Sequence, residues 1–297
     1  MGYDTLACFI ACLCFSIAAW LCLSMRAYVR IHLLRGPFLD DVLALIGAVL
    51  FTAMAVLFMI NSWFVANEKK PTPEARMTVA KIGFSIDMLY LVGTFTMKLS
   101  FARTLSRIIQ THTQAIVLYM TIMAGAIITI AVIIQGFLYC QPFSYMWKQI
   151  LGSASSHCHA RWTRITASLV QAAWVVVADV VLGLIIPCIL LRGCRMNLGT
   201  RISVHVLLGL GSIAGIATVI RMPYAAIGIG VDSNKNALAI RFWEITELAI
   251  NIICTSAATW RPLFYKPIQP EPVPLEEQTC RNSLSDGVVE HGWPPDC

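Results

Sequence analysis

The chain has 297 residues, of which 58% are hydrophobic and only 13% are charged, whereas a typical soluble domain has about 25% charged residues. This composition excludes an ordinary soluble protein and is typical of a membrane protein. The net charge of +6 is spread over the loops, with no basic run among stacking aromatic residues. We therefore expect no nucleic-acid partner.

Seven apolar stretches are close to the roughly 20 residues that an α-helix needs to cross a bilayer core. We interpret them as helices, because backbone polar groups in lipid must be paired within their own segment or in a closed barrel. The predicted fold is an all-α membrane protein, a seven-transmembrane helix bundle in the plasma membrane or an endomembrane. The expected helices cover residues 5–24, 42–64, 82–101, 114–137, 165–191, 203–228 and 240–260.

The basic residues around the first stretch predict its orientation. Residues 1–4 have none, whereas Arg26, Arg30 and Arg35 follow the stretch, and Lys and Arg near the end of a span resist translocation. We therefore expect the amino terminus outside and, after seven crossings, the carboxyl terminus inside. No basic region or small-residue cleavage site marks the stretch as a signal peptide, so we expect an uncleaved helix.

The composition changes after the last stretch. The segment "KPIQPEPVPLEEQ" is rich in proline and acidic residues, a composition that cannot bury enough apolar surface to fold. We predict a seven-transmembrane domain over residues 1–264 and a disordered cytosolic tail over residues 265–297. Longer loops are expected at 65–81 and 138–163, both outside.

Two prolines fall in the expected fifth and sixth helices. Pro187 and Pro223 should kink or end these helices, because proline lacks the backbone N–H that an inner helical turn uses. For Pro187 the simpler expectation is the end of a helix.

Five ionisable residues fall inside the expected spans, namely Asp87, Asp179, Arg221, Glu244 and Glu247. A charge near the centre of a span costs about 2.5 to 3.5 kcal/mol on insertion, so each should be paired or functional. At about 1.5 Å per residue, Asp87, Arg221 and Glu247 lie roughly 8 to 10 Å from the outer surface. Three charges from three helices therefore share one level.

Polar residues in these helices recur at helical spacing and should face the interior of the bundle. They are Asp87, Tyr90, Thr94 and Lys98 in the third helix, Ser168, Gln171 and Asp179 in the fifth, and Glu244, Glu247, Asn251 and Thr255 in the seventh.

We predict that Arg221 pairs with Glu247 or Glu244, and that Asp87 lies across a small polar cavity that opens outward. Glu247 is the preferred partner, since Glu244 is nearer the outer interface. The candidate ligand-binding residues are Asp87, Arg221, Glu244, Glu247 and Asn251. An ionic staple between the sixth and seventh helices, without a ligand, is an equally good interpretation.

Two cysteines lie in the loop that is expected to face the oxidising side. A disulfide between Cys140 and Cys158 is the preferred prediction. A metal site built from Cys140, His157, Cys158 and His159 is disfavoured, because adjacent residues rarely converge on one ion with good geometry. We therefore predict no metal. No cofactor is expected either, because residues 240–260 contain no lysine of the kind that retinal proteins need in their seventh helix.

The chain resembles the fungal rhodopsin-like integral membrane family, which is named for its seven helices rather than for retinal. No single motif is specific, but their order over residues 20 to 264 is. The motifs are Arg26, Tyr28, Arg30 and Asp40–Asp41 after the first helix, Lys98, Ser100 and Arg103 at the end of the third, Cys140–Gln141–Pro142, Trp147 and Cys158 in the loop, Asp179, Pro187 and Arg221, and finally Trp243, Glu247, Asn251 and Arg261–Phe264.

The resemblance implies one of two roles, because the family includes members encoded in secondary-metabolite gene clusters, such as the satratoxin cluster, and receptor-like proteins of plant-pathogenic fungi. In the first role the protein acts on or with a lipophilic metabolite, as an enzyme or as an accessory factor of pathway proteins. In an enzyme, Glu247 or Asp87 would be the general acid or base and Arg221 would stabilise developing negative charge. In the second role the cavity binds an extracellular ligand, and inner arginines such as Arg103 and Arg107 contact a cytosolic partner.

Overall fold

The computed structural model describes residues 5–33, 39–67, 72–107, 109, 111–148, 159, 161–193, 215–223 and 233–260. These residues are almost entirely helical and include no extended strand, so the all-α prediction is confirmed for this part of the chain. The predicted tail over residues 265–297 lies outside the described residues, as does most of the expected helix over residues 203–228.

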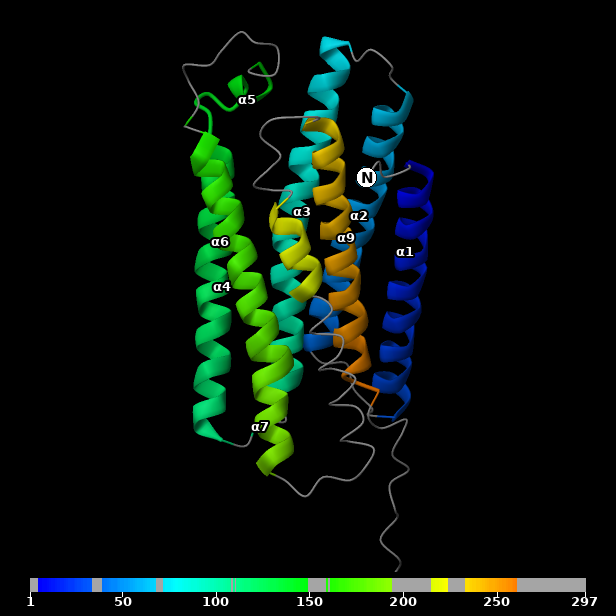
Figure 1. Cartoon of the computed structure of the whole chain (residues 1–297). Helices are drawn as coiled ribbons and strands as arrows, with labels where there is room; N and C mark the ends of the chain where they lie inside the picture. The colour runs from blue at the N-terminus through cyan, green and yellow to red at the C-terminus, as the bar shows by residue number, and fades with distance from the viewer. Residues whose placement is uncertain are drawn as a thin grey trace, which may run out of the picture. The chain divides into compact units, whose positions relative to one another are not determined.

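The helices follow one another along the chain as Figure 1 shows. Five helical stretches among the described residues are long and apolar enough to cross a membrane: Leu6–His32, Leu39–Val65, Pro73–Ser106, His112–Leu138 and Trp162–Ile189. The elements are α1 Thr5–Tyr28 with the π-helical turn η1 Val29–Leu33, α2 Leu39–Asn67, α3 Pro73–Ser106, α4 His112–Leu138, the short α5 Tyr145–Lys148, α6 Arg161–Val180, the π-helical turn η4 Val181–Ile185, α7 Ile186–Gly193, and α9 Ser233–Ala257.

A further helical segment covers residues 215–223. This segment falls within the sixth expected span, over residues 203–228. Helix α9 overlaps the seventh, over residues 240–260, but begins already at Ser233. Neither is among the five membrane-capable stretches. The count of seven spans and the orientation of the termini therefore stay predictions.

The expected long loop over residues 65–81 is wrong. In the structure α2 continues to Asn67 and α3 already begins at Pro73. Thr72 caps α3 by accepting a hydrogen bond from the backbone N–H of Ala75 at 3.3 Å, and proline occupies the start of the helix. The Thr72–Pro73–Glu74 sequence is a helix-start signal that the hydropathy pattern alone does not reveal.

Helix α3 lies at the centre of the packing, because it contacts α2, α4 and α9. On one side, residues such as Phe51, Phe58, Ile86 and Leu248 form a buried cluster between α1, α2, α3 and α9. On the other, Phe101, Leu118, Trp174 and Leu182 belong to a second cluster between α3, α4, α6 and η4. Many large apolar side chains point outward, among them Leu6, Trp63, Met120, Ile127 and Trp162. An apolar exterior of this kind is suited to contact with lipid.

Pro187 does not end its helix. The chain remains helical from Arg161 to Gly193, and the wide turn Val181–Ile185 ends two residues before the proline. In a regular helix the ring of Pro187 would press on the carbonyl of Gly183, and a wider turn relieves that contact. The structure thus accommodates the proline within a continuous helical stretch.

Two glycines of α4 give a matched test of packing. A Cβ at Gly125 would lie 2.0 Å from Cζ2 of the buried Trp174, whereas a Cβ at Gly136 would lie 2.8 Å from the flexible end of Met88. We expect Gly125→Ala to lower the free energy of unfolding by about 1 to 3 kcal/mol, because the rigid indole must move. Gly136→Ala should cause no loss, since Met88 can shift and alanine favours the helix by about 1 kcal/mol. Thermal unfolding of both variants in detergent measures the difference, and equal effects would contradict the packing.

Candidate functional site

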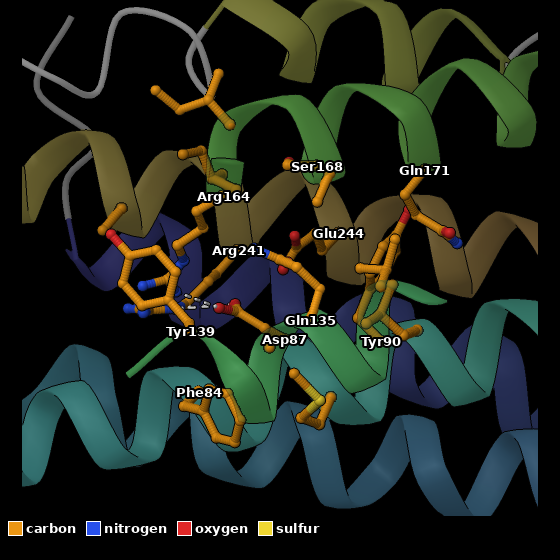
Figure 2. Close-up of a pocket in the computed structure, with 18 of the residues that line it drawn as sticks. Phe84, Asp87, Tyr90, Gln135, Tyr139, Arg164, Ser168, Gln171, Arg241 and Glu244 are labelled. Atoms are coloured by element: carbon orange, nitrogen blue, oxygen red, sulfur yellow. Dashed lines mark hydrogen bonds and ion pairs between the residues drawn. The ribbon is translucent and has the colours of Figure 1, made fainter. Parts of the chain in front are cut away.

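A cavity of about 330 Å³ lies between α3, α4, α5, α6, the segment 215–223 and α9. Figure 2 shows it from close by. Much of its wall is apolar, contributed by Phe84, Met88, Leu91, Val132, Met146, Ile165 and Ile240. Small-molecule sites typically combine such a wall with a few convergent polar groups.

One part of the wall, which we call the rim, consists of Asp87, Arg164 and Arg241. The Asp87 carboxylate lies 3.4 Å from Nη2 of Arg164 and 3.9 Å from Nε of Arg241. The side chains of Asp87 and Arg164 are 32% and 52% exposed, so these ion pairs are screened by solvent and contribute little stability. Asp87 therefore lines the expected cavity, but its ionic partners are Arg164 and Arg241 rather than Arg221.

A second part of the wall, the floor, consists of Tyr90, Gln171, Arg221 and Glu244, all of them buried. Tyr90 and Glu244 lie three residues beyond Asp87 and Arg241 on their helices, and Gln171 lies seven residues beyond Arg164. These spacings bring rim and floor to one face of each helix.

Arg221 holds the floor together. Its guanidinium donates to Oε1 of Glu244 at 2.9 Å and to the Tyr90 hydroxyl at 3.0 Å. Its Cζ atom also lies 4.8 Å from the centre of the Tyr90 ring, within the range of a cation–π contact. The predicted partner Glu244 thus pairs directly with Arg221.

Glu247 is fully buried behind the floor and does not line the cavity. Its Oε1 accepts a hydrogen bond from the Tyr90 hydroxyl at 2.8 Å, and its Oε2 lies 3.9 Å from Nε of Arg221. One guanidinium therefore faces two carboxylates, with a phenol as the bridge. Because Glu244 and not Glu247 lines the cavity, the preference for Glu247 that we drew from the sequence does not match this geometry.

Asn251 lies one turn of α9 further along and belongs to a second polar cluster. Lys98 donates to its Oδ1 at 3.1 Å and also donates to Oδ1 of Asp179. Lys98 and Asp179 are 3% and 7% exposed. The five residues chosen from the sequence thus divide into Asp87, Arg221 and Glu244 on the cavity, Glu247 behind it, and Asn251 beside Lys98.

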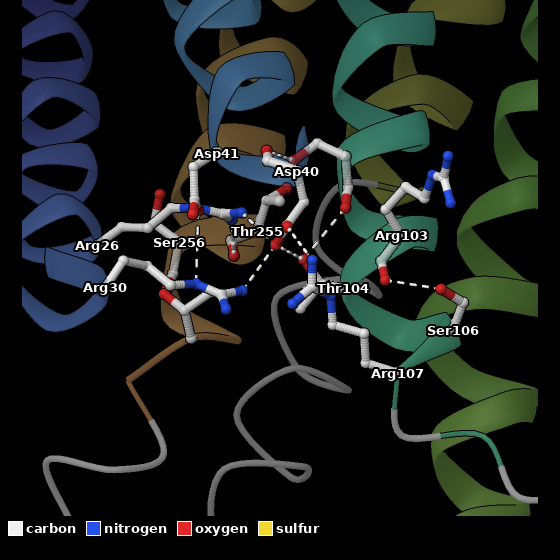
Figure 3. A network of polar contacts seen from close by, with 12 residues as sticks. Arg26, Arg30, Asp40, Asp41, Arg103, Thr104, Ser106, Arg107, Thr255 and Ser256 are labelled. Atoms are coloured by element: carbon white, nitrogen blue, oxygen red, sulfur yellow. Dashed lines mark hydrogen bonds and ion pairs between the residues drawn. The ribbon is translucent and has the colours of Figure 1, made fainter. Parts of the chain in front are cut away.

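A third cluster closes the far end of the same helices (Figure 3). Asp40 is inaccessible and accepts hydrogen bonds from Arg26 at 3.1 Å, Arg30 at 2.6 Å and Arg107 at 3.0 Å. Arg26 also donates to the backbone carbonyl of Thr255 at 2.8 Å. This arginine–aspartate cluster ties α1, η1, α2, α3 and α9 together.

The family model of the fungal rhodopsin domain matches residues 25–266. The chain belongs to this family. No curated protein and no solved structure matches it. The resemblance seen in the motifs is confirmed, and together with the five membrane-capable helices it makes this fungal rhodopsin-domain protein a multi-pass membrane protein in contact with the lipid bilayer.

Cys140 of this fungal rhodopsin-domain protein is disulfide-bonded. Its predicted partner Cys158 lies outside the described residues, so the pairing stays a prediction. Among the described residues no three His, Cys, Asp or Glu side chains are grouped in a way that could hold a metal ion. His157 of the disfavoured metal site also lies outside these residues.

Several residues of the site were not singled out from the sequence. Tyr90 and Gln171 lie on the polar stripes recognised there, so their spacing carried a usable signal. Arg164 and Arg241 fall at the ends of their expected spans, where an arginine more often anchors a helix at the interface. Nothing in the sequence indicates that both converge on Asp87.

The buried Lys98–Asp179 pair of the fungal rhodopsin-domain protein gives a direct test of charge pairing. Lys98→Met leaves an uncompensated carboxylate in the bundle, so we expect the free energy of unfolding to fall by about 3 to 5 kcal/mol. The double variant Lys98→Met/Asp179→Leu should recover most of this loss, because both charges are then gone. Thermal unfolding in detergent measures both, with Lys81→Met on the exposed face of α3 as the control. A double variant no more stable than Lys98→Met would contradict the pairing.

Proposed function

We propose that this protein is a seven-transmembrane component of fungal secondary-metabolite biosynthesis that acts on or with a lipophilic small molecule. The observation that carries the proposal is the buried Glu244 in the wall of a largely apolar cavity, with one oxygen that has no hydrogen-bond partner in the described part of the chain. An apolar compound could reach such a cavity from the lipid phase. The amino terminus is outside and the carboxyl terminus inside in this proposal, as the basic residues predict.

The floor offers an acid–base arrangement. Glu244 pairs through Oε1 with Arg221, while its Oε2 has no hydrogen-bond partner among the described residues. That oxygen can accept a proton from a bound compound and return it at a second position, as a general base and then a general acid. Arg221, held by Tyr90 and both glutamates, stabilises negative charge that develops beside it. Glu247 supports Tyr90 from behind, and Asp87 sits at the rim.

Deletion of the gene, followed by metabolite profiling, tests this role. We expect an intermediate to accumulate in the deletion strain and to persist when the strain is complemented with Glu244→Gln, because glutamine keeps the shape but cannot take up a proton. A lost general base should lower product formation about 10²- to 10⁴-fold. Glu74→Gln, in the exposed first turn of α3, is the matched control and should restore the product. An unchanged metabolite profile in the deletion strain would refute the role in biosynthesis.

A receptor-like sensor of an extracellular ligand, without retinal, is the second candidate. It is favoured by the polar stripe of α9, which runs past three sites. Glu244 and Glu247 contact Arg221 and Tyr90 at the cavity, and Asn251 contacts Lys98 of the Lys98–Asp179 pair. The backbone carbonyl of Thr255 accepts a hydrogen bond from Arg26 of the arginine–aspartate cluster. A ligand that moves Glu244 could thus bias contacts at the far end. There Arg103 is exposed, and Arg107, which donates to Asp40, is 40% exposed. In this second candidate a cytosolic partner would contact the exposed surface of both.

The variant Asn251→Leu separates the two candidates. It removes the acceptor for Lys98 in the middle of the stripe but leaves the cavity wall intact. A sensor should then lose its transcriptional response to host contact while metabolite levels measured without that stimulus are unchanged. A biosynthetic component should show no transcriptional response to lose. RNA sequencing of the complemented strains, alongside a Glu74→Gln strain, provides the measurement.

A further inference from the structure

Gln171 of α6 is a buried side chain for which the described part of the chain supplies no hydrogen-bond partner. It is 2% exposed, and neither its amide oxygen nor its amide nitrogen has a hydrogen-bond partner among the described residues. It lines the cavity opposite the wall formed by α3 and α9. A buried amide left unpaired is costly, so buried polar groups are normally satisfied by protein, water or ligand.

Two other atoms of the same cavity wall are in the same state. Oε2 of Glu244 and Nε2 of Gln135 are buried and have no hydrogen-bond partner among the described residues. Figure 2 shows Gln135 and Glu244 near each other, with Gln171 set apart from both, and all three line the same cavity. The cavity therefore presents amide N–H donors and oxygen acceptors together, within an otherwise apolar wall.

We infer that the cavity binds an uncharged lipophile that carries a hydroxyl group. A hydroxyl is one donor and one acceptor on a single atom, so it can donate to Glu244 or to the oxygen of Gln171 and accept from an amide of Gln171 or Gln135. This inference rests on the proposed function, for which it names the ligand class.

Charge complementarity disfavours the two ionic alternatives. A carboxylate would be the third negative group beside Glu244 and Glu247, which already share the single guanidinium of Arg221. An ammonium could satisfy Glu244, but it has no lone pair to accept a hydrogen bond from the amides. The rim arginines Arg164 and Arg241 already face Asp87, so an anion bound to them would compete with this carboxylate.

Thermal unfolding of the full chain in lipid nanodiscs tests the inference, with decanol, decanoic acid and decylamine as probes of equal chain length. We expect decanol to raise the Tm of the wild type by several degrees more than either ionic probe, because a ligand stabilises the state that it binds. In Gln171→Met, which preserves side-chain length and shape, that extra shift should be lost. Gln135→Met should reduce it.

Gln114→Met is the matched control. Like Gln171, Gln114 is buried, and its amide oxygen has no hydrogen-bond partner within the described ranges, but it lies in the first turn of α4 and does not line the cavity. Gln171→Met and Gln114→Met each remove a buried polar group without a hydrogen-bond partner among the described residues, so each should raise the Tm of the ligand-free protein. Of these two variants, only Gln114→Met should keep the response to decanol.

The outcomes are distinct. Equal shifts from all three probes would overturn the hydroxyl preference and leave a cavity for lipophiles, as in the proposed function. A decanol response that survives in Gln171→Met would overturn the role of Gln171 and hence the inference. No shift from any probe would overturn both the inference and the cavity as a ligand site, whereas a normal metabolite profile in the deletion strain would overturn the proposed function alone.

Discussion

A charge can be buried in a bundle of this kind only if another helix supplies its counterpart. Helix α9 carries Glu244 and Glu247 into the interior, and both depend on Arg221 and Tyr90 from other parts of the chain. Since a rotation of α9 by one residue would turn these carboxylates away from their partners, the pairing fixes the rotation of α9 and thereby the position of every other residue on its polar stripe.

Arginine and aspartate occur at both ends of the helices, but they do different things there. Around Asp40, three arginines and Thr104 donate hydrogen bonds to one carboxylate, and the result is a compact ionic cluster. Around Asp87, two arginines approach at longer distances, and a cavity opens beside them. A dense ionic cluster holds helices together, whereas ion pairs at longer distances leave room for a ligand. This contrast is the structural reason for placing the function at the second end.

The sequence was sufficient for the all-helical character of the described residues, for the five membrane-capable helices and for part of the site. Hydropathy predicts the long apolar spans. The estimated depth of each charged residue in the membrane and the helical spacing of polar residues together predict that Arg221 lies close to Glu244 and Glu247. The sequence could not show which of the two glutamates is the site residue, because that depends on which one faces the cavity. Nor could it pair Lys98 with Asp179, since each stripe was assigned to the interior but the relative rotation of α3 and α6 is a property of packing. The start of α3 at Pro73 was missed because hydropathy says little about a polar helical end.

The wide turn Val181–Ile185 has a consequence for the history of this chain. A π-helical turn holds one residue more than a regular turn, and a residue added to a helix rotates all that follows by about 100° unless the turn widens to absorb it. Asp179 before the turn and Ile186 after it are both buried, so both sides keep their facing. A related chain that lost this extra residue would keep the same inward positions, and its alignment with this one should show a single-residue gap between Asp179 and Pro187.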